Sequence, residues 1–174
     1  MFKYIAVAAL ALTFSSVIAG TTFADDTVAG QLTISDPLIR ATAPKARVAG
    51  GFMTITNHGD QADRLISGTA SFAGKTEIHE MAMQGEVMKM RQLAEGLEIP
   101  AGGSVSLMPG GYHIMFMKLG EQLMPGETRK VTVTFEKAGE VALDMNVLSI
   151  GDLKKHMEAH KSDAKHMHGA HSNN

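Results

Sequence analysis

The stretch of sequence that decides the fold is Gly111-Tyr-His-Ile-Met-Phe-Met117, along which two kinds of side chain alternate. Successive side chains of a β-strand point to opposite faces, so the Tyr, Ile and Phe would share one face. Two aromatic side chains and one β-branched side chain on the same face are typical of a face that is buried in a core. The stretch therefore predicts a strand that is buried on one side. The other side carries His113, Met115 and Met117.

Short apolar runs of this kind continue from Leu32 to about Leu148. Gly, Pro, Asn and Asp separate the runs and there is hardly any 3.6-residue periodicity, which is typical of an all-β sandwich or barrel. The sequence Gln84-Gly85-Glu86 is expected to close a hairpin. We expect one domain over residues 25–150, with strands near 30–34, 38–42, 49–57, 63–70, 75–83, 87–93, 104–108, 112–118, 129–136 and 140–147.

Two more of these segments place histidine or methionine on alternate positions. In Thr76-Glu-Ile-His-Glu-Met-Ala-Met83 the histidine and both methionines share a face, and in Val87-Met-Lys-Met-Arg91 the two methionines do. Three neighbouring strands can thus bring two imidazoles and several thioethers together. The residues concerned are His79, Met81 and Met83 on the first segment and Met88 and Met90 on the second.

Imidazole and thioether together match the chemistry of Cu(I). Thioether sulfur is a soft ligand that suits Cu(I), whereas Mg²⁺ and Ca²⁺ prefer oxygen. The chain has no cysteine, which excludes a blue-copper electron-transfer site, because that site needs a thiolate. Thioethers also remain available in an oxidising compartment, where thiolates would be lost to disulfides. The pattern therefore predicts a Cu(I) centre.

Packing is the competing explanation for methionine, which commonly fills gaps in cores. We assign packing to four isolated methionines and a structural or surface role to His58, which falls in a turn. For four others, two alternatives stay open, since each could pack or line the site. The first group is Met53, Met108, Met124 and Met145, and the second is Met81, Met83, Met88 and Met117.

The series His79, ten residues, Met90, then His113-Ile-Met115 resembles the motif of the PCu(A)C periplasmic copper chaperones, His-x10-Met-x21-His-x-Met. Surrounding segments resemble the family over about residues 30–147, and they include Gly51-Phe-Met-Thr-Ile-Thr-Asn57, Asp63-Arg-Leu65, Ile99-Pro-Ala-Gly-Gly103 and Pro109-Gly-Gly111. The resemblance implies a cupredoxin-like Greek-key β-sandwich and a copper-accepting partner, namely the CuA or CuB centres of cytochrome oxidase. It implies as Cu(I) ligands His79, Met90, His113 and Met115.

The chain departs from the family motif at one point, since 22 residues separate Met90 from His113. An extra residue in the loop Gln92-Leu-Ala-Glu-Gly96 would cost little closure entropy. A shift of strand register would instead turn Met90 away from the site. The sequence leaves both alternatives open.

The N-terminus has the layout of a secretory signal. Lys3 precedes an apolar run from Tyr4 to Ala19 and a small-residue exit ending at Ala24, so we expect residues 1–24 to be removed and the mature chain to be periplasmic. The run is shorter than the roughly 20 residues that span a bilayer, and no later stretch is apolar enough, so we expect no membrane insertion of the mature chain. A formal charge of −2, more negative by one after loss of Lys3, argues against nucleic acid as a partner.

The last segment, 151–174, changes composition to Lys, His, Ala, Asp, Asn and Met. Such a segment buries little surface, so we expect a mobile tail. His-rich tracts bind metals, and imidazole with few thioethers favours Cu(II). The predicted tail ligands are His156, His160, His166, His168, His171, Met157 and Met167.

Four functional hypotheses follow from the sequence. A copper chaperone and a copper buffer or resistance protein without a dedicated acceptor would share the same site. An enzyme is not expected, because the chain lacks cysteine, a Gly-x-Ser-x-Gly elbow and a His-Glu-x-x-His helix. The fourth is an interaction module whose methionines only pack.

Overall fold

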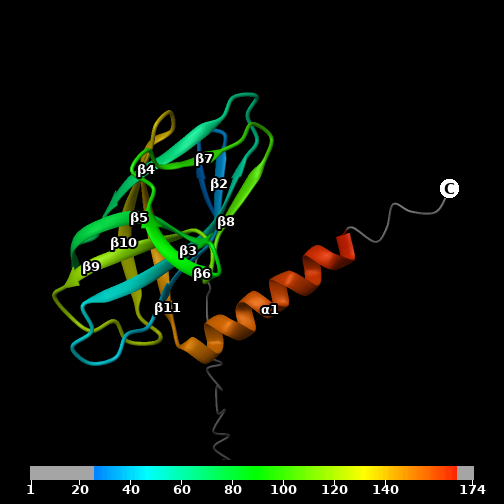
Figure 1. Cartoon of the computed structure of the whole chain (residues 1–174). Coiled ribbons are helices and arrows are strands. Elements are labelled where there is room, and N and C mark those ends of the chain that lie inside the picture. The colour runs from blue at the N-terminus through cyan, green and yellow to red at the C-terminus, as the bar shows by residue number, and fades with distance from the viewer. Residues whose placement is uncertain (1–25, 168–174) are drawn as a thin grey trace, which may run out of the picture.

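The computed structural model describes residues 26–167, with side chains as far as Ala159. These residues form eleven β-strands and one α-helix (Figure 1). The predicted signal peptide, residues 1–24, lies outside the described residues. The elements are β1 (Thr27–Ala29), β2 (Leu32–Arg40), β3 (Val48–Asn57), β4 (Asp63–Thr69), β5 (Ala73–Gln84), β6 (Val87–Gln92), β7 (Leu97–Ile99), β8 (Ser104–Leu107), β9 (His113–Leu119), β10 (Thr128–Phe135), β11 (Gly139–Leu148) and α1 (Ile150–Met167).

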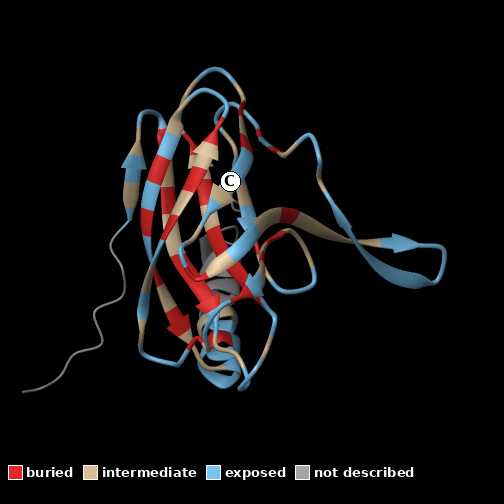
Figure 2. Cartoon of the chain, turned by 90° about the vertical axis from the view of Figure 1, so that its left-hand side faces the viewer, coloured by how far each residue is buried: buried red, intermediate tan, exposed pale blue. Residues whose placement is uncertain are grey.

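The strands hydrogen-bond in the order β6-β5-β9-β3-β2-β11-β10-β4-β7, with β1 added to β2 and β8 added to β3. The pairing of β2 with β11 is parallel and the other pairs are antiparallel. This path folds into a β-sandwich whose buried residues line the inside of the layers (Figure 2). The prediction of an all-β sandwich is confirmed.

The core is built from the faces that the alternation predicts. On β9, Ile114 and Phe116 are fully buried, and Tyr112 packs partly buried against the same cluster. Burial of one large apolar side chain contributes roughly 1.5–3 kcal/mol, so these side chains fix which face of β9 points inward. The opposite face of β9 is left for the histidine and methionines.

Strand boundaries differ from the prediction mainly in β2. The segments predicted as two strands, 30–34 and 38–42, form one strand whose pairing with β3 shifts between Ser35 and Leu38. Asp36 has a φ of 51° and Pro37 has no N–H to donate, so this bulge breaks the ladder without ending the strand. The prediction also omitted the three-residue strands β1 and β7.

The C-terminal segment is helical through Met167, so the prediction of a mobile tail is wrong for its first part. Ser149 caps α1, because its Oγ accepts the N–H of Asp152 at 3.1 Å and donates to the Asp152 carboxylate at 2.6 Å. Leu153 is buried and Met157 packs one turn later on Leu38 and Phe52. No helix of the described residues is both long enough and apolar enough to cross a membrane.

Replacing Leu153 with Ala should detach this helix from the sandwich. The substitution removes most of a buried side chain, so the free energy of unfolding should fall by about 2 kcal/mol and the helical circular-dichroism signal should weaken. Urea denaturation and far-UV spectra measure both quantities. Lys154→Ala, at an exposed neighbouring position, is the matched control. Unchanged stability and helicity in Leu153→Ala would show that α1 is not held by this contact.

Candidate metal centre

Strand β5 positions the candidate site because it pairs with β9 on one side and with β6 on the other (Figure 1). Residues that face each other in these ladders lie on the same side of the sheet. His79 is opposite His113 on β9, and the next position along the hairpin places Met81 opposite Met90 on β6. In the other direction Glu77 is opposite Met115. The outer face of three strands thus brings the predicted ligands together.

The two histidines form the centre of this face. Their ring centroids are 5.8 Å apart with planes inclined by 58°, and both side chains are largely buried. Among the residues whose side chains the structure describes, no group of three or more His, Asp or Glu is arranged to hold a metal ion. The side chains next to this pair of imidazoles on the same face are the thioethers of Met81, Met90 and Met115.

The His79 ring is oriented by Glu77. His79 Nε2–H donates to the Glu77 carboxylate at 2.6 Å, and Lys75 binds the same carboxylate. Hydrogen bonds from Lys75 and then from His79 lower the pKa of Glu77, so this group remains a carboxylate. The second ring nitrogen, Nδ1 of His79, is buried and has no hydrogen-bond partner. A buried polar atom without a partner carries a desolvation cost, which a bound ligand would offset.

The His113 ring is oriented by the backbone. Its Nδ1–H donates to the carbonyl of Gly111 at 3.1 Å. In the neutral ring Nε2 therefore carries a lone pair, and this atom lies 3.3 Å from Met90 Sδ. Burial lowers the pKa of His113, the bond to Gly111 opposes this shift, and the charges of His79 and Arg40 add to the lowering. The imidazole is therefore held in its neutral, metal-binding form.

The methionines are arranged at increasing distance from this pair. Met90 touches His113, while Met81 and Met115 each lie one same-face position away from a histidine. Met83 and Met88 face each other one step further toward the hairpin tip, and Met117 lies beside Lys75 and Val48 in the opposite direction. A same-face step is about 7 Å, so Met83, Met88 and Met117 do not reach the histidines directly.

Met90 remains on the face of the histidines despite the longer spacing to His113. Strand β6 keeps its register with β5 to its end at Gln92, and the chain then turns through a loop in which the Gly96 N–H binds the Leu93 carbonyl at 3.0 Å. Of the two alternatives that the sequence left open, the shift of register is wrong.

The packing assignments hold for two of the four isolated methionines. Met53 and Met145 are buried in the core, and Met108 is partly exposed beside Gly111. Met124 is 47% exposed, so packing is the wrong explanation there. His58 has the structural role expected, because its Nε2 is hydrogen-bonded to Thr33 Oγ1 at 3.1 Å.

Only His156 and Met157 of the predicted tail ligands have described side chains. Nε2 of His156 lies 3.2 Å from the Asp36 carboxylate, and Met157 packs in the cluster of Leu38 and Phe52. Side chains of the other five, His160, His166, Met167, His168 and His171, lie outside the described part of the chain. The Cu(II) site of the tail stays a prediction, and Met157 serves packing.

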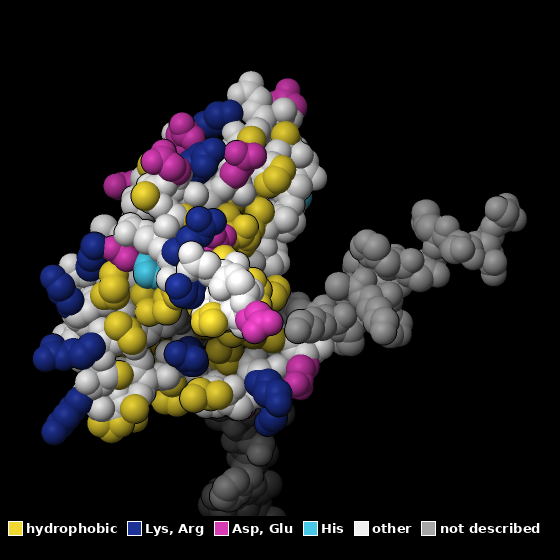
Figure 3. Space-filling model, viewed as in Figure 1, with side chains coloured by type: hydrophobic (Ala, Val, Ile, Leu, Met, Phe, Trp, Pro, Cys, Tyr) yellow, Lys and Arg dark blue, Asp and Glu magenta, His cyan; other side chains and the backbone are white. Residues whose placement is uncertain are grey.

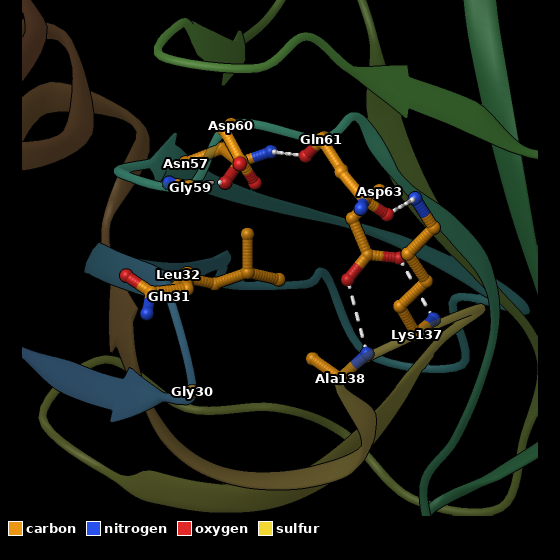
Figure 4. Close-up of a pocket in the computed structure, with 10 residues that line it drawn as sticks. All are labelled: Gly30, Gln31, Leu32, Asn57, Gly59, Asp60, Gln61, Asp63, Lys137 and Ala138. Atoms are coloured by element: carbon orange, nitrogen blue, oxygen red, sulfur yellow. Dashed lines mark hydrogen bonds between the residues drawn. The ribbon is translucent and has the colours of Figure 1, made fainter.

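A pocket at the other end of β3 has a structural role (Figure 4). The Asp63 carboxylate there accepts the backbone N–H groups of Arg64, Lys137 and Ala138 at 2.7–3.0 Å, and the Asn57 side chain donates to the carbonyl of Gln61. These bonds join the β3–β4 loop to the β10–β11 turn. The Asp63 carboxylate and the Asn57 amide are therefore used to hold these loops together.

Glu77 and the Gly111 carbonyl are site groups that the sequence analysis missed. Metal-binding histidines commonly donate their second N–H to a carboxylate or backbone carbonyl, which fixes the ring orientation and raises ligand basicity. Glu77 precedes His79 by two residues on the same face, so the alternation that revealed the methionines could also have revealed this carboxylate. No pattern in the sequence indicates that the Gly111 carbonyl accepts a hydrogen bond from His113.

These hydrogen bonds predict opposite tautomers for the two neutral rings. His79 should carry its proton on Nε2 and His113 should carry it on Nδ1. Long-range ¹H–¹⁵N spectra of the neutral rings distinguish the two forms. Glu77→Gln should weaken the preference at His79, while Glu80→Gln, which removes the partner of Arg91, should leave it unchanged. The same tautomer at both rings would contradict this arrangement.

Comparison with known proteins assigns the fold. Residues 32–147 match the LpqE-like family, described as "Putative lipoprotein LpqE-like". A protein of Leifsonia xyli subsp. xyli, "Putative lipoprotein Lxx21020", is 33% identical over 94 residues. That match covers 51% of this chain and 57% of the relative, so the chain spans little more than half the length of the curated relative. This chain contains no cysteine.

Two solved structures share the sandwich. The copper-bound PCuAC domain of PmoF2 aligns with a TM-score of 0.62 at 25% identity, over 72% of this chain and 98% of that domain. The solution structure of CuI-DR1885 from Deinococcus radiodurans aligns with a TM-score of 0.55 at 26% identity, over 66% of this chain and 76% of that protein. The expectation of a cupredoxin-like sandwich is confirmed. The chain belongs to the LpqE-like family of PCu(A)C-type proteins.

Proposed function

We propose that this protein is an exported copper chaperone that binds Cu(I) and passes it to an acceptor protein. The observation that carries the proposal is the pair of imidazole nitrogens on the β5–β6–β9 face that can bind a metal ion, Nδ1 of His79 and Nε2 of His113. His113 Nε2 lies 3.3 Å from Met90 Sδ, and the buried Nδ1 of the neighbouring His79 has no partner. The proposed Cu(I) ligands are His79, His113, Met90 and Met115.

The spacing of these donors suits one metal ion. In zinc sites, bonds from the metal to histidine nitrogen and to cysteine sulfur are about 2.0 and 2.3 Å long. The 3.3 Å between His113 Nε2 and Met90 Sδ is therefore short enough for a single ion to bond both. The structures of the copper-bound PmoF2 domain and of CuI-DR1885 support copper as the ion.

The donor set selects the oxidation state. Two neutral imidazoles and soft thioethers favour Cu(I) over hard divalent ions. The lowered pKa of His113 keeps its ring ready to bind, because a protonated imidazole has no free lone pair. The Glu77 carboxylate adds negative charge next to His79 and offsets the charge of the incoming cation. We therefore assign the site a binding role and no catalytic one.

Release requires that a partner can reach the metal. Met90 is 46% exposed on an edge strand whose six residues are all exposed, whereas the histidines are largely buried. An acceptor can thus displace the methionine first while the imidazoles still hold the ion. This graded exposure suits transfer to a protein ligand, and we propose the CuA or CuB centres of cytochrome oxidase as the destination.

The proposed location is the periplasm, with the signal sequence cleaved near Ala24. Lipoprotein relatives support export. A copper buffer or resistance protein without a dedicated acceptor is the alternative, because it would use the same ligands. The tail histidines would add a separate Cu(II) site to either function.

X-ray absorption on the Cu(I)-loaded protein tests the ligand set. The copper edge should show Cu(I) with two nitrogen and two sulfur neighbours, and Met90→Leu should lose one sulfur. Met124→Leu, which removes an equally exposed methionine away from the site, should change nothing. An unchanged sulfur count in Met90→Leu would mean that Met81, which lies opposite Met90, is the ligand instead. Absence of sulfur neighbours in the wild type would refute the proposed site.

A transfer assay separates a chaperone from a buffer. Cu(I)-loaded protein is mixed with an apo CuA domain and, in parallel, with a small-molecule chelator of matched Cu(I) affinity. If the protein is a chaperone, Cu(I) should pass to the CuA domain faster than it passes to the chelator, because docking places the acceptor ligands beside Met90. A buffer should load both at the same rate, limited by dissociation of the metal. Equal rates would therefore support the buffer.

A further inference from the structure

The tip of the β5–β6 hairpin carries two methionines that the four-ligand site does not use. Met83 on β5 faces Met88 on β6, on the same side of the hairpin as Met81, Met90 and the histidines. Met83 is 60% exposed and Met88 is 47% exposed. The hairpin projects from the sandwich, with exposed residues throughout its outer part (Figure 2).

Packing does not explain this pair. Neither residue belongs to the core or to the cluster beneath α1, and methionine is an unusual choice for a solvated hairpin tip. Hydrophobic side chains, a class that includes methionine, gather over β5, β6 and β9 among Lys and Arg (Figure 3). The pair places two thioether sulfurs, which are neutral and soft metal ligands, directly opposite each other on the two strands of the hairpin.

The rungs of the hairpin form a continuous line of thioethers. The outer rung is Met83 with Met88, the next is Met81 with Met90, and the last places His79 beside His113. One same-face step is about 7 Å. Each methionine side chain has three rotatable bonds, so sulfurs on adjacent rungs can approach one ion from both sides.

We propose that Met83 and Met88 form an outer Cu(I) site through which copper reaches and leaves the inner site. This inference rests on the proposed function. The transfer is a ligand exchange: a bond from copper to Met83 or Met88 sulfur breaks as a bond to Met81 or Met90 sulfur forms. Copper remains Cu(I), no electron moves, and no proton is released because thioethers are neutral. Two sulfurs without an imidazole should hold copper more weakly than the inner site.

The experiment compares full-length wild type with the double variant Met83→Leu, Met88→Leu. Leucine keeps the apolar character and approximate size at exposed positions, so folding should be unaffected and only the sulfur is lost. Two quantities are measured anaerobically: the equilibrium affinity for the first Cu(I), and the rate at which Cu(I) passes to excess bathocuproine disulfonate. Met124→Leu is the matched control, since it removes an exposed thioether elsewhere.

The double variant should keep the equilibrium affinity of the wild type and lose copper to the chelator roughly tenfold more slowly, because the outer sulfurs lower the barrier to exchange. The control should match the wild type in both quantities. A wild-type exchange rate in the double variant would overturn the proposal. A weakened first-site affinity would overturn it too, because the pair would then belong to the inner site.

A second measurement uses Ag(I), a diamagnetic ion with similar soft-ligand preference, and the methyl signals of ¹³C-labelled methionine. The first equivalent should shift the signals of Met90 and Met115, and the second should shift those of Met83 and Met88. If the first equivalent shifts no methionine signal, the proposed function fails. If only the second step is missing, the proposed function stands and the outer site fails.

Discussion

The pairing of β5 with β9 on one side and β6 on the other is the constraint on which the candidate site depends. A slip of one residue in either ladder would invert the face of a strand and turn its histidine or methionines away. Burial of the inner face prevents such a slip between β5 and β9. Ile78 pairs with Ile114, and both are buried in the core beside Phe116. The hydrophobic core therefore fixes how His79 and His113 face each other, whereas Met90 is placed by the pairing of β6 with β5.

The close packing beneath the site shows how tightly this register is specified. Gly51 on β3 faces Ile114, and a Cβ atom at Gly51 would come within 2.7 Å of the Phe116 ring. Glycine there allows the ring to lie against the β3 backbone. The neighbouring Gly50 faces Met115 and leaves space that the Phe52 ring approaches. The same Phe52 packs against α1, so the helix and the candidate site share one outer surface.

Alternation along single strands made the fold class and the site face predictable from the sequence. The segments at His79, Met90 and His113 each carry a strict period of two, and in the segments at His79 and His113 one face is buried, with Ile78 and Ile114 in the core. The cross-strand neighbours could not be read in this way, since register depends on turns and packing far along the chain. The contact between His113 on β9 and Met90 on β6 therefore became visible only in the structure.

The helix was missed for a different reason. Composition after Ile150 is strongly polar and predicts disorder when it is averaged over the whole segment. The decisive signals are local: Ser149 with Asp152 at the start, then Leu153 and Met157 one turn apart. Two apolar residues at this spacing are enough when a complementary surface is present. That surface, Leu38 with Phe52, is formed by strands distant in sequence.

Burial of the His79 ring carries a free-energy cost that metal binding can offset. Leaving His79 Nδ1 buried without a partner costs about 1–3 kcal/mol. A ligand that satisfies this atom stabilises the native state by its own binding free energy. An ion shared by His113 and Met90 would also tie β6, which otherwise pairs only with β5, to the body of the sandwich. Its stabilising effect should therefore be concentrated in the hairpin, the segment from which copper must also be released.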